Sequence, residues 1–310
     1  MAGLHDDEIP IDADLVRALV ADALPQYAGL DIRPLGASGS TNALFRLGSD
    51  LLVRIPRQPG GSAIEKEARW LPMVERELSA AVPTVIALGD PGHGYPQHWS
   101  VNRYLQGRLP TVVADQVPPE GPRHGLADDL AVLVQQLHAI EVPDAALHDE
   151  ELTWYRGGPL GDVDGSFRRS LAASREIDDL DLDLSAAVRV WDQALEAARA
   201  ADPAPSWYHG DLLAENLLVS DDGRLSAVLD FGTLGVGDPA VDLVVAWEVL
   251  DPESRETFRR AVEVDDATWL RAMGWALYIA LVTFPYYWDT MPARCADRRV
   301  MVRAVLADAA

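Results

Sequence analysis

Short apolar runs separated by polar turns dominate the first hundred residues. Runs of strand length occur at residues 32–35, 43–47, 51–55, 82–88 and 98–105. Between the third and fourth runs, apolar residues recur at helical spacing, at Ile64, Ala68, Leu71 and Val74. An earlier helix is expected between Asp12, which can cap it, and Pro25, which ends it. This pattern predicts a five-stranded antiparallel sheet with one main helix.

Helical periodicity takes over after Gly107. Helices are expected around residues 126–137 and 188–198, and again at about 240–250, 252–262, 267–283 and 292–307. A hairpin interrupts them, with strands at 217–219 and 225–229 joined by a turn at Asp221-Asp222-Gly223. The chain is therefore predicted to be an α+β protein with two lobes. A small sheet lobe spans residues 1–105 with a hinge at about 102–107, and a larger, mainly helical lobe with a β-hairpin spans 106–310.

The charge and the cysteine content limit the kinds of partner and the cellular compartment that we expect for this protein. The chain has 49 acidic and 26 basic residues, a formal net charge of −23, which repels nucleic-acid backbones. Its single cysteine cannot form an internal disulfide, which is typical of a reducing compartment. The N-terminus is acidic where a signal peptide would be basic, and the longest apolar run, at 275–284, is too short for a bilayer and stops at Pro285. We expect a cytoplasmic protein with no nucleic-acid, membrane or obligate protein partner.

The hairpin carries the strongest chemical signal. Asp211 and Asn216 precede its first strand, and Asp230 follows its second. The three side chains can converge at one end of the hairpin, where two carboxylates and an amide oxygen suit Mg²⁺. The order of these residues matches the phosphoryl-transfer template of protein kinases: a catalytic-loop aspartate, an asparagine five residues on, and the aspartate of a D-F-G sequence.

Neighbouring residues are expected to shape the loop around this site. His209, directly before Gly210 and Asp211, is expected to orient the loop. Asp238 precedes Pro239 and is a good helix cap. Asp242 is expected to hydrogen-bond loop backbone. Asp238 and Asp242 are expected to be structural, and a direct catalytic role is the alternative for His209. Taken alone, Asp211 or Asp230 could also be an ordinary turn or capping residue.

Taken together, H-G-D-x-x-x-x-N, D-F-G and G-D-P-x-x-D-L resemble the aminoglycoside phosphotransferase family of small-molecule kinases, which includes macrolide phosphotransferases. V-R-I-P and E-A-R-W-L in the first lobe extend the resemblance over most of the chain. It implies a protein-kinase-like two-lobed fold that uses ATP or GTP and Mg²⁺ to phosphorylate a hydroxyl. By this match Asp211 would be the catalytic base, and Asn216 and Asp230 would be metal ligands.

The first lobe should bind the nucleotide, and there the sequence departs from the protein-kinase pattern. Arg54 stands on the third strand where protein kinases place a phosphate-binding lysine. A guanidinium has a permanent charge and a forked set of donors that suits phosphate oxygens. The resemblance makes Glu67 its ion-pair partner, with Glu65 as the rival. Lys66, the only lysine, is expected on the solvated face of the helix.

Two backbone segments complete the predicted nucleotide site. The loop before the second strand contains Ser38, Gly39, Ser40, Thr41 and Asn42. It could offer amides and hydroxyls to phosphates, although it lacks the third glycine of G-x-G-x-x-G and could be a plain hairpin turn. The hinge residues Arg103, Tyr104 and Leu105 follow the fifth strand, where such folds hydrogen-bond adenine through backbone groups.

The acceptor is less well marked. Glu248, Asp251 and Asp289 could bind ammonium groups, and Tyr287 could line the pocket, although aromatic core packing is the alternative for it. The negative charge favours a cationic, aminoglycoside-type acceptor. A macrolide, another antibiotic, a sugar or a choline-like metabolite is the alternative. Two other readings remain: a nucleotide-binding pseudokinase and a metal-dependent phosphohydrolase.

Overall fold

The computed structural model describes residues 8–36, 41–59 and 63–310. The chain divides into two compact units. The sheet unit comprises Met1–Glu77, Ala81–Gln106 and Ala227–Gly232, and the helical unit comprises Leu78–Ala80, Gly107–Ser226 and Thr233–Ala310. The sheet unit therefore includes the D-F-G segment, which the sequence pattern places in the second lobe.

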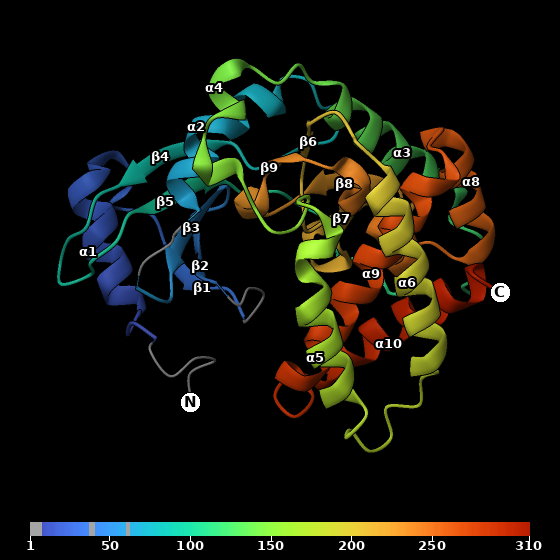
Figure 1. Ribbon diagram of the computed structural model, residues 1–310. Coiled ribbons are helices and arrows are strands. Elements are labelled where there is room, and N and C mark those ends of the chain that lie inside the picture. The colour runs from blue at the N-terminus through green and yellow to red at the C-terminus, as the bar shows by residue number, and fades with distance from the viewer. Residues whose placement is uncertain (1–7, 37–40, 60–62) are drawn as a thin grey trace. The chain divides into compact units, whose positions relative to one another are not determined.

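An antiparallel five-stranded sheet forms the centre of the sheet unit, in the order β1-β2-β3-β5-β4, as predicted. Its elements are α1 (Ala13–Ala23), β1 (Ile32–Pro34), β2 (Asn42–Leu47), β3 (Leu51–Pro56), α2 (Ile64–Glu75), β4 (Val85–Gly89) and β5 (Trp99–Arg103), with a 3₁₀ turn at Pro25–Tyr27 (Figure 1). Asp12 caps α1 by accepting hydrogen bonds from the backbone of Asp14 and Leu15.

The core of the sheet unit lies between α1 and one face of the sheet. β2 alternates buried and half-buried residues, so its apolar side chains Ala43, Phe45 and Leu47 point to this core. Trp99 packs so closely on β4 that a β-carbon at Gly89 would lie 2.0 Å from its ring. Glycine is therefore required opposite this tryptophan.

Helices dominate the second unit. They are α3 (His124–Ala139), α4 (Asp144–Leu147), α5 (Asp164–Ser174), α6 (Leu184–Ala200), α7 (Ala246–Val249), α8 (Pro252–Val262), α9 (Asp266–Tyr287) and α10 (Pro292–Asp308). The apolar helix α9 packs against α5, α6 and α10 (Figure 1). Short 3₁₀ segments occur at Glu150–Leu152, Leu160–Val163, Ala214–Asn216, Phe231–Thr233 and Pro239–Val245.

The sequence pattern is wrong about the end of α9. The helix continues through Pro285 to Tyr287 instead of stopping before the proline. Its length and composition would allow a membrane span, yet 78% of the apolar stretch is buried inside the protein. A core helix of a folded domain has these same properties, so we read α9 as the central core helix of its unit.

Four short strands flank the loops that contain Asp211, Asn216 and Asp230. β6 (Ser206–Tyr208) pairs antiparallel with β9 (Gly235–Gly237), a pairing that the sequence pattern does not predict. β7 (Leu217–Val219) and β8 (Leu225–Val228) form the predicted hairpin. The end of β8 belongs to the sheet unit, where the backbone N–H of Val228 donates to the carbonyl of Ala81 at 2.9 Å.

Candidate active site

A buried ion pair marks the predicted nucleotide site of the sheet unit. Arg54 on β3 donates two hydrogen bonds to Glu67 on α2, from Nη1 to Oε2 at 2.5 Å and from Nη2 to Oε1 at 2.9 Å. Their side chains are 8% and 1% exposed. This forked geometry is the strong form of a charged hydrogen bond. Glu67, not its rival Glu65, is thus the partner of Arg54.

Arg54 also contacts the D-F-G aspartate. Its Nη2 donates to Asp230 Oδ1 at 3.1 Å. Burial alone would lower the pKa of Arg54, but the Glu67 and Asp230 carboxylates outweigh it and raise that pKa. The arginine is therefore a permanent cation held between two carboxylates, one of which is about half exposed.

Tight packing fixes Asp230 in this position. Its φ of +57° lies in the left-handed region, which aspartate tolerates better than most residues. A β-carbon at Gly232 would lie 3.1 Å from Asp230 Oδ1 and 3.4 Å from Glu67 Oε1. The glycine of D-F-G leaves room for both carboxylates.

The expectation for Lys66 is wrong. Its side chain is buried, not solvated. Its charge acts on Glu67 by lowering that residue's pKa, against the larger opposite effect of burial. The helical pattern of α2 places Ile64, Leu71 and Val74 inside but gives no signal that this lysine shares their buried environment.

In the helical unit, Asp242 holds the His209-Gly210-Asp211 loop. Its two carboxylate oxygens accept hydrogen bonds from the backbone N–H groups of His209 and Gly210, each at 2.8 Å. His209 Nδ1 in turn accepts a hydrogen bond from the N–H of Asp211 at 3.2 Å. Asp238 caps the following 3₁₀ segment through the N–H of Ala240.

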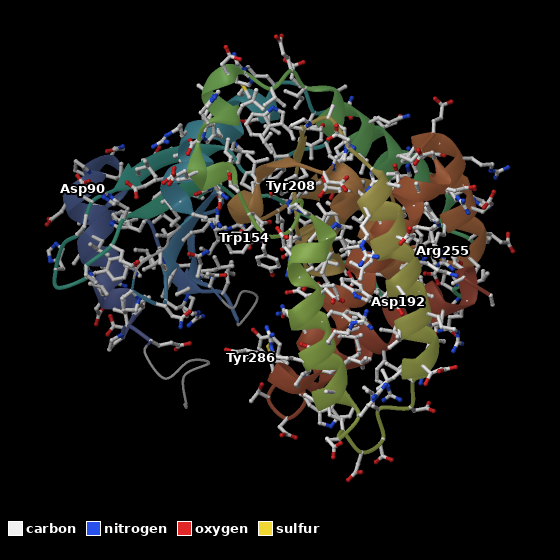
Figure 2. All side chains as sticks on the ribbon, viewed as in Figure 1. Asp90, Trp154, Asp192, Tyr208, Arg255 and Tyr286 are labelled. Atoms are coloured by element: carbon white, nitrogen blue, oxygen red, sulfur yellow. The ribbon has the colours of Figure 1, made fainter. Side chains whose placement is uncertain are left out.

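Asp242→Ala is expected to destabilise the protein by about 2–5 kcal/mol, because it leaves two buried N–H groups without an acceptor. Urea denaturation at neutral pH measures the effect. Asp192→Asn is the matched control, because Asp192 (labelled in Figure 2) is an exposed partner of Arg168 and its loss should change stability by less than about 0.5 kcal/mol. Equal stability of the two variants would contradict the role of Asp242.

Two donors orient the side chain of Asp211. Asn216 Nδ2 donates to Asp211 Oδ2 at 3.0 Å and to its backbone carbonyl at 2.8 Å. Arg156 Nη1 donates to Oδ1. Burial by itself would raise the pKa of Asp211, but the neighbouring positive charge of Arg156 and its hydrogen bond to the carboxylate outweigh it and lower that pKa. The carboxylate is therefore ionised and fixed at both oxygens.

Asn216 and Asp230 have the donor chemistry for Mg²⁺. The amide nitrogen of Asn216 donates to Asp211, so the amide oxygen of Asn216 remains for a cation. One carboxylate oxygen of Asp230 accepts a hydrogen bond from Arg54. The side chain is half exposed, so its other carboxylate oxygen remains accessible. Carboxylate and amide oxygens are the ligands that Mg²⁺ prefers. Because the two residues belong to different units, their predicted convergence stays a prediction.

The described residues offer no other obvious metal site. No group of three or more His, Cys, Asp and Glu side chains that could hold a metal ion occurs among residues 8–36, 41–59 and 63–310. His93 Nε2 lies 2.6 Å from Asp22 Oδ2, and the two ring nitrogens of His98 lie 3.6 Å from Glu65 Oε1 and 3.5 Å from Asp90 Oδ1.

The predicted backbone contacts to the nucleotide are only partly described. Ser38, Gly39 and Ser40 lie outside the described residues, while Thr41 and Asn42 lead directly into β2. The N–H groups of Arg103 and Tyr104 donate to the carbonyls of Thr84 and Asp50. These two donors are therefore already used within the sheet unit.

The predictions that Glu248 and Asp251 bind the acceptor are wrong. Glu248 is fully buried, and its oxygens accept hydrogen bonds from the N–H of Ala214 at 2.6 Å and from Arg298. Asp251 is also fully buried and caps α8. Both carboxylates are already paired inside the protein, so neither can receive an ammonium group.

The other two candidates remain accessible. Tyr287 is half-buried at the end of α9, where Arg294 lies 5.5 Å from its ring centroid. Asp289 is exposed in the following turn. Tyr286, beside them, is an exposed aromatic side chain (Figure 2). Their part in acceptor binding stays a prediction.

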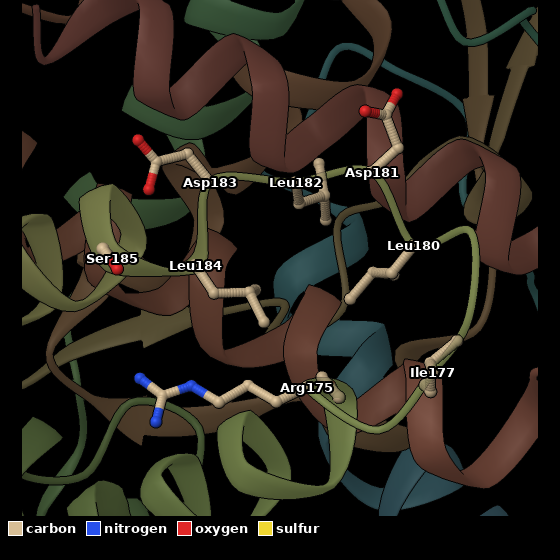
Figure 3. Close-up of a pocket in the computed structure, with 9 residues that line it drawn as sticks. Arg175, Ile177, Leu180, Asp181, Leu182, Asp183, Leu184 and Ser185 are labelled. Atoms are coloured by element: carbon tan, nitrogen blue, oxygen red, sulfur yellow. The ribbon is translucent and has the colours of Figure 1, made fainter.

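A shallow cavity of about 510 Å³ opens elsewhere in the helical unit. It is lined by side chains from residues 174–185, between α5 and α6 (Figure 3). None of the residues predicted for nucleotide, metal or acceptor binding lines it. The cavity therefore adds nothing to the site around Asp211.

Comparison with known proteins decides the family. The family model described as "Phosphotransferase enzyme family" matches residues 31–275, which include every motif discussed above. The chain belongs to this family. An aminoglycoside 3'-phosphotransferase of Escherichia coli is 27% identical to this phosphotransferase over 224 residues, covering 70% of the chain and 76% of the relative.

Solved structures show the same fold. The GDP complex of wild-type aminoglycoside 2'-phosphotransferase-IIIa superposes with a TM-score of 0.67 at 18% identity, covering 97% of this chain and all of the other. The apoenzyme of a macrolide 2'-phosphotransferase from Brachybacterium faecium gives 0.57 at 23% identity, covering 96% and 98% of the two chains. The predicted two-lobed α+β kinase-like fold is thereby confirmed.

The sequence does not predict the part of Arg156 in this site. No motif marks it, and it lies far along the chain from Asp211, which it contacts. The one available hint is the pair Gly157-Gly158 directly after it, which indicates a tight backbone approach.

Proposed function

We propose that this phosphotransferase transfers the γ-phosphate of ATP or GTP to a hydroxyl group of a small-molecule acceptor. The observation that carries the proposal is the Asp211 carboxylate, which is ionised, partly accessible and held at both oxygens by Asn216 and Arg156. A fixed carboxylate is what a phosphoryl-transfer enzyme needs to align an attacking hydroxyl.

Each residue of the site has its own role in the proposed reaction. Asp211 accepts a hydrogen bond from the acceptor hydroxyl, aligns its oxygen and takes its proton as the bond from that oxygen to the γ-phosphorus forms. The bond from the γ-phosphorus to the bridging oxygen breaks at the same time, and the nucleoside diphosphate leaves. Arg54, kept in place by Glu67, offsets the charge of the nucleotide phosphates. Asn216 and Asp230 would hold Mg²⁺, which when bound neutralises charge on the phosphate oxygens. Asp242 and His209 keep the loop in shape.

For the acceptor we favour a hydroxylated antibiotic of the aminoglycoside type. The 27% identical relative carries that activity in its name, and a net charge of −23 attracts polycations. A macrolide is the second candidate, since a solved macrolide 2'-phosphotransferase shares the fold. ATP and GTP are both cytoplasmic, and we place the reaction there.

A panel assay tests the proposal. The full chain is incubated with Mg²⁺ and either ATP or GTP, together with aminoglycosides, macrolides, peptide antibiotics, sugars or choline, and the product is identified by mass. We expect one acceptor class to gain a phosphoryl group. Nucleotide binding without any transfer would favour a pseudokinase, and phosphate release that needs no acceptor would favour a phosphohydrolase.

A further inference from the structure

Arg156 contacts the Asp211 loop at atoms that Asp242 does not contact. Besides its bond to Asp211 Oδ1, its Nη1 donates to the carbonyl of Gly210 at 3.2 Å. The N–H of the same glycine donates to Asp242. Gly210 is therefore held at both ends of its backbone, through its N–H by Asp242 and through its carbonyl by Arg156.

The segment that carries Arg156 is packed tightly against β6 and β9. Gly157 has a φ of +85°, and a β-carbon there would lie 2.2 Å from the ring of Tyr208. A β-carbon at Gly237 would lie 2.3 Å from the carbonyl oxygen of Gly157, which accepts a hydrogen bond from the N–H of Asp238 at 2.7 Å. These two close approaches and the hydrogen bond restrict the position of the segment.

Tyr208 links the two loops. It is the last residue of β6, and Asp211 follows it by three positions. Its hydroxyl lies 3.5 Å from the carbonyl of Trp154, two residues before Arg156 (Figure 2). One strand end thus supports both the segment that carries the arginine and the loop that carries the aspartate.

The other partners of Arg156 restrict its rotamer. Its Nε donates to the hydroxyl of Tyr155 at 3.1 Å, and its side chain is 16% exposed. Arg298 also acts on Asp211 by its charge, but it hydrogen-bonds to Glu248 and Glu215. Arg156 is thus the arginine that bonds the Asp211 carboxylate directly.

We propose that Arg156 is a positioning residue for phosphoryl transfer, which fixes the Asp211 carboxylate in the orientation that receives the acceptor hydroxyl. This inference rests on the proposed function. Arg156 bonds Oδ1 and Asn216 bonds Oδ2, so rotation of the carboxylate is blocked while each oxygen keeps lone-pair capacity for the hydroxyl.

The test compares Arg156→Gln and Arg156→Lys with the wild type on an acceptor that the wild type phosphorylates. Arg156→Gln should lower kcat about 10–100-fold, the order expected for a misplaced catalytic group, and leave the KM for nucleotide within about twofold. Arg156→Lys keeps a cation near Oδ1 and should recover part of the loss. Added guanidinium should partly restore an Arg156→Ala variant.

Arg168→Gln is the matched control, because Arg168 forms aspartate pairs in the same unit but contacts neither Asp211 nor Gly210. It should keep the wild-type kcat. A kcat for Arg156→Gln within twofold of wild type would overturn the inference, as would equal losses in the Gln and Lys variants. An inactive wild type would instead contradict the proposed function, so the two failures are distinguishable.

Discussion

Asp211→Asn is expected to lower kcat by about 10²–10⁴ with nucleotide binding retained. Asparagine has the same shape and can keep an oxygen toward Asn216 or Arg156, but it cannot take a proton and has no charge to align the hydroxyl. The variant should fold, because the loop is held through backbone bonds to Asp242 that do not involve this side chain.

Steady-state kinetics and nucleotide titration measure the two halves of this prediction. Asp129→Asn is a suitable control, since Asp129 pairs with Arg224 in the same unit away from the loop. A kcat of Asp211→Asn within twofold of wild type would remove Asp211 from the role of base. Loss of nucleotide binding together with kcat would instead indicate a folding defect.

Arg54→Met is expected to destabilise the protein by about 3–5 kcal/mol and to weaken nucleotide binding about 10–100-fold. The first effect arises because Glu67 is left as a buried carboxylate without its cation. The second arises because the phosphates lose a charged donor, whose hydrogen bonds are worth about 1.5–3 kcal/mol. Urea denaturation and nucleotide titration measure the two effects separately.

The double variant Arg54→Met with Glu67→Leu separates these causes. Replacing both members of a buried ion pair by apolar residues is often neutral for stability, so the double variant should regain most of the loss. It should not regain nucleotide affinity, because the guanidinium is still absent. Recovery of both properties, or of neither, would contradict the account of this pair.

The pH dependence of Arg54→Met follows from the sign of the Glu67 shift. Burial raises the pKa of Glu67, and without Arg54 that rise is unopposed by its main partner. A raised folded pKa gives stability that is present below the ordinary glutamate pKa of about 4.3 and is lost as the pH rises. The loss of stability of Arg54→Met relative to the wild type should therefore become smaller as the pH falls from neutral toward pH 5.

The strand and helix pattern of this chain is local, and so it could be predicted. Alternating burial along β2 and the helical repeat of α2 follow from side-chain chemistry within a few residues. The motif residues of the Asp211 loop could be predicted for the same reason. Their spacing along the chain is short and their chemistry is specific.

Features that depend on distant parts of the chain could not be predicted. Because Glu248 is acidic, the sequence suggests a surface position for it. Only the folded unit brings Arg298 to its carboxylate. Arg156 reaches Asp211 because Gly157 and Tyr208 pack together, a contact that no local pattern records. α9 passes Pro285 although the proline has no N–H to donate, and beyond it the N–H of Trp288 still donates to the carbonyl of Phe284.

The proposed role of Asp211 is to align the acceptor hydroxyl for attack on the γ-phosphate of the nucleotide. The mass of the acceptor, after incubation with Mg²⁺, nucleotide and either wild-type protein or Asp211→Asn, reports on this role. We expect the acceptor to gain one phosphoryl group with the wild type and to stay unmodified over the same time with the variant. Equal phosphorylation by both proteins would contradict it.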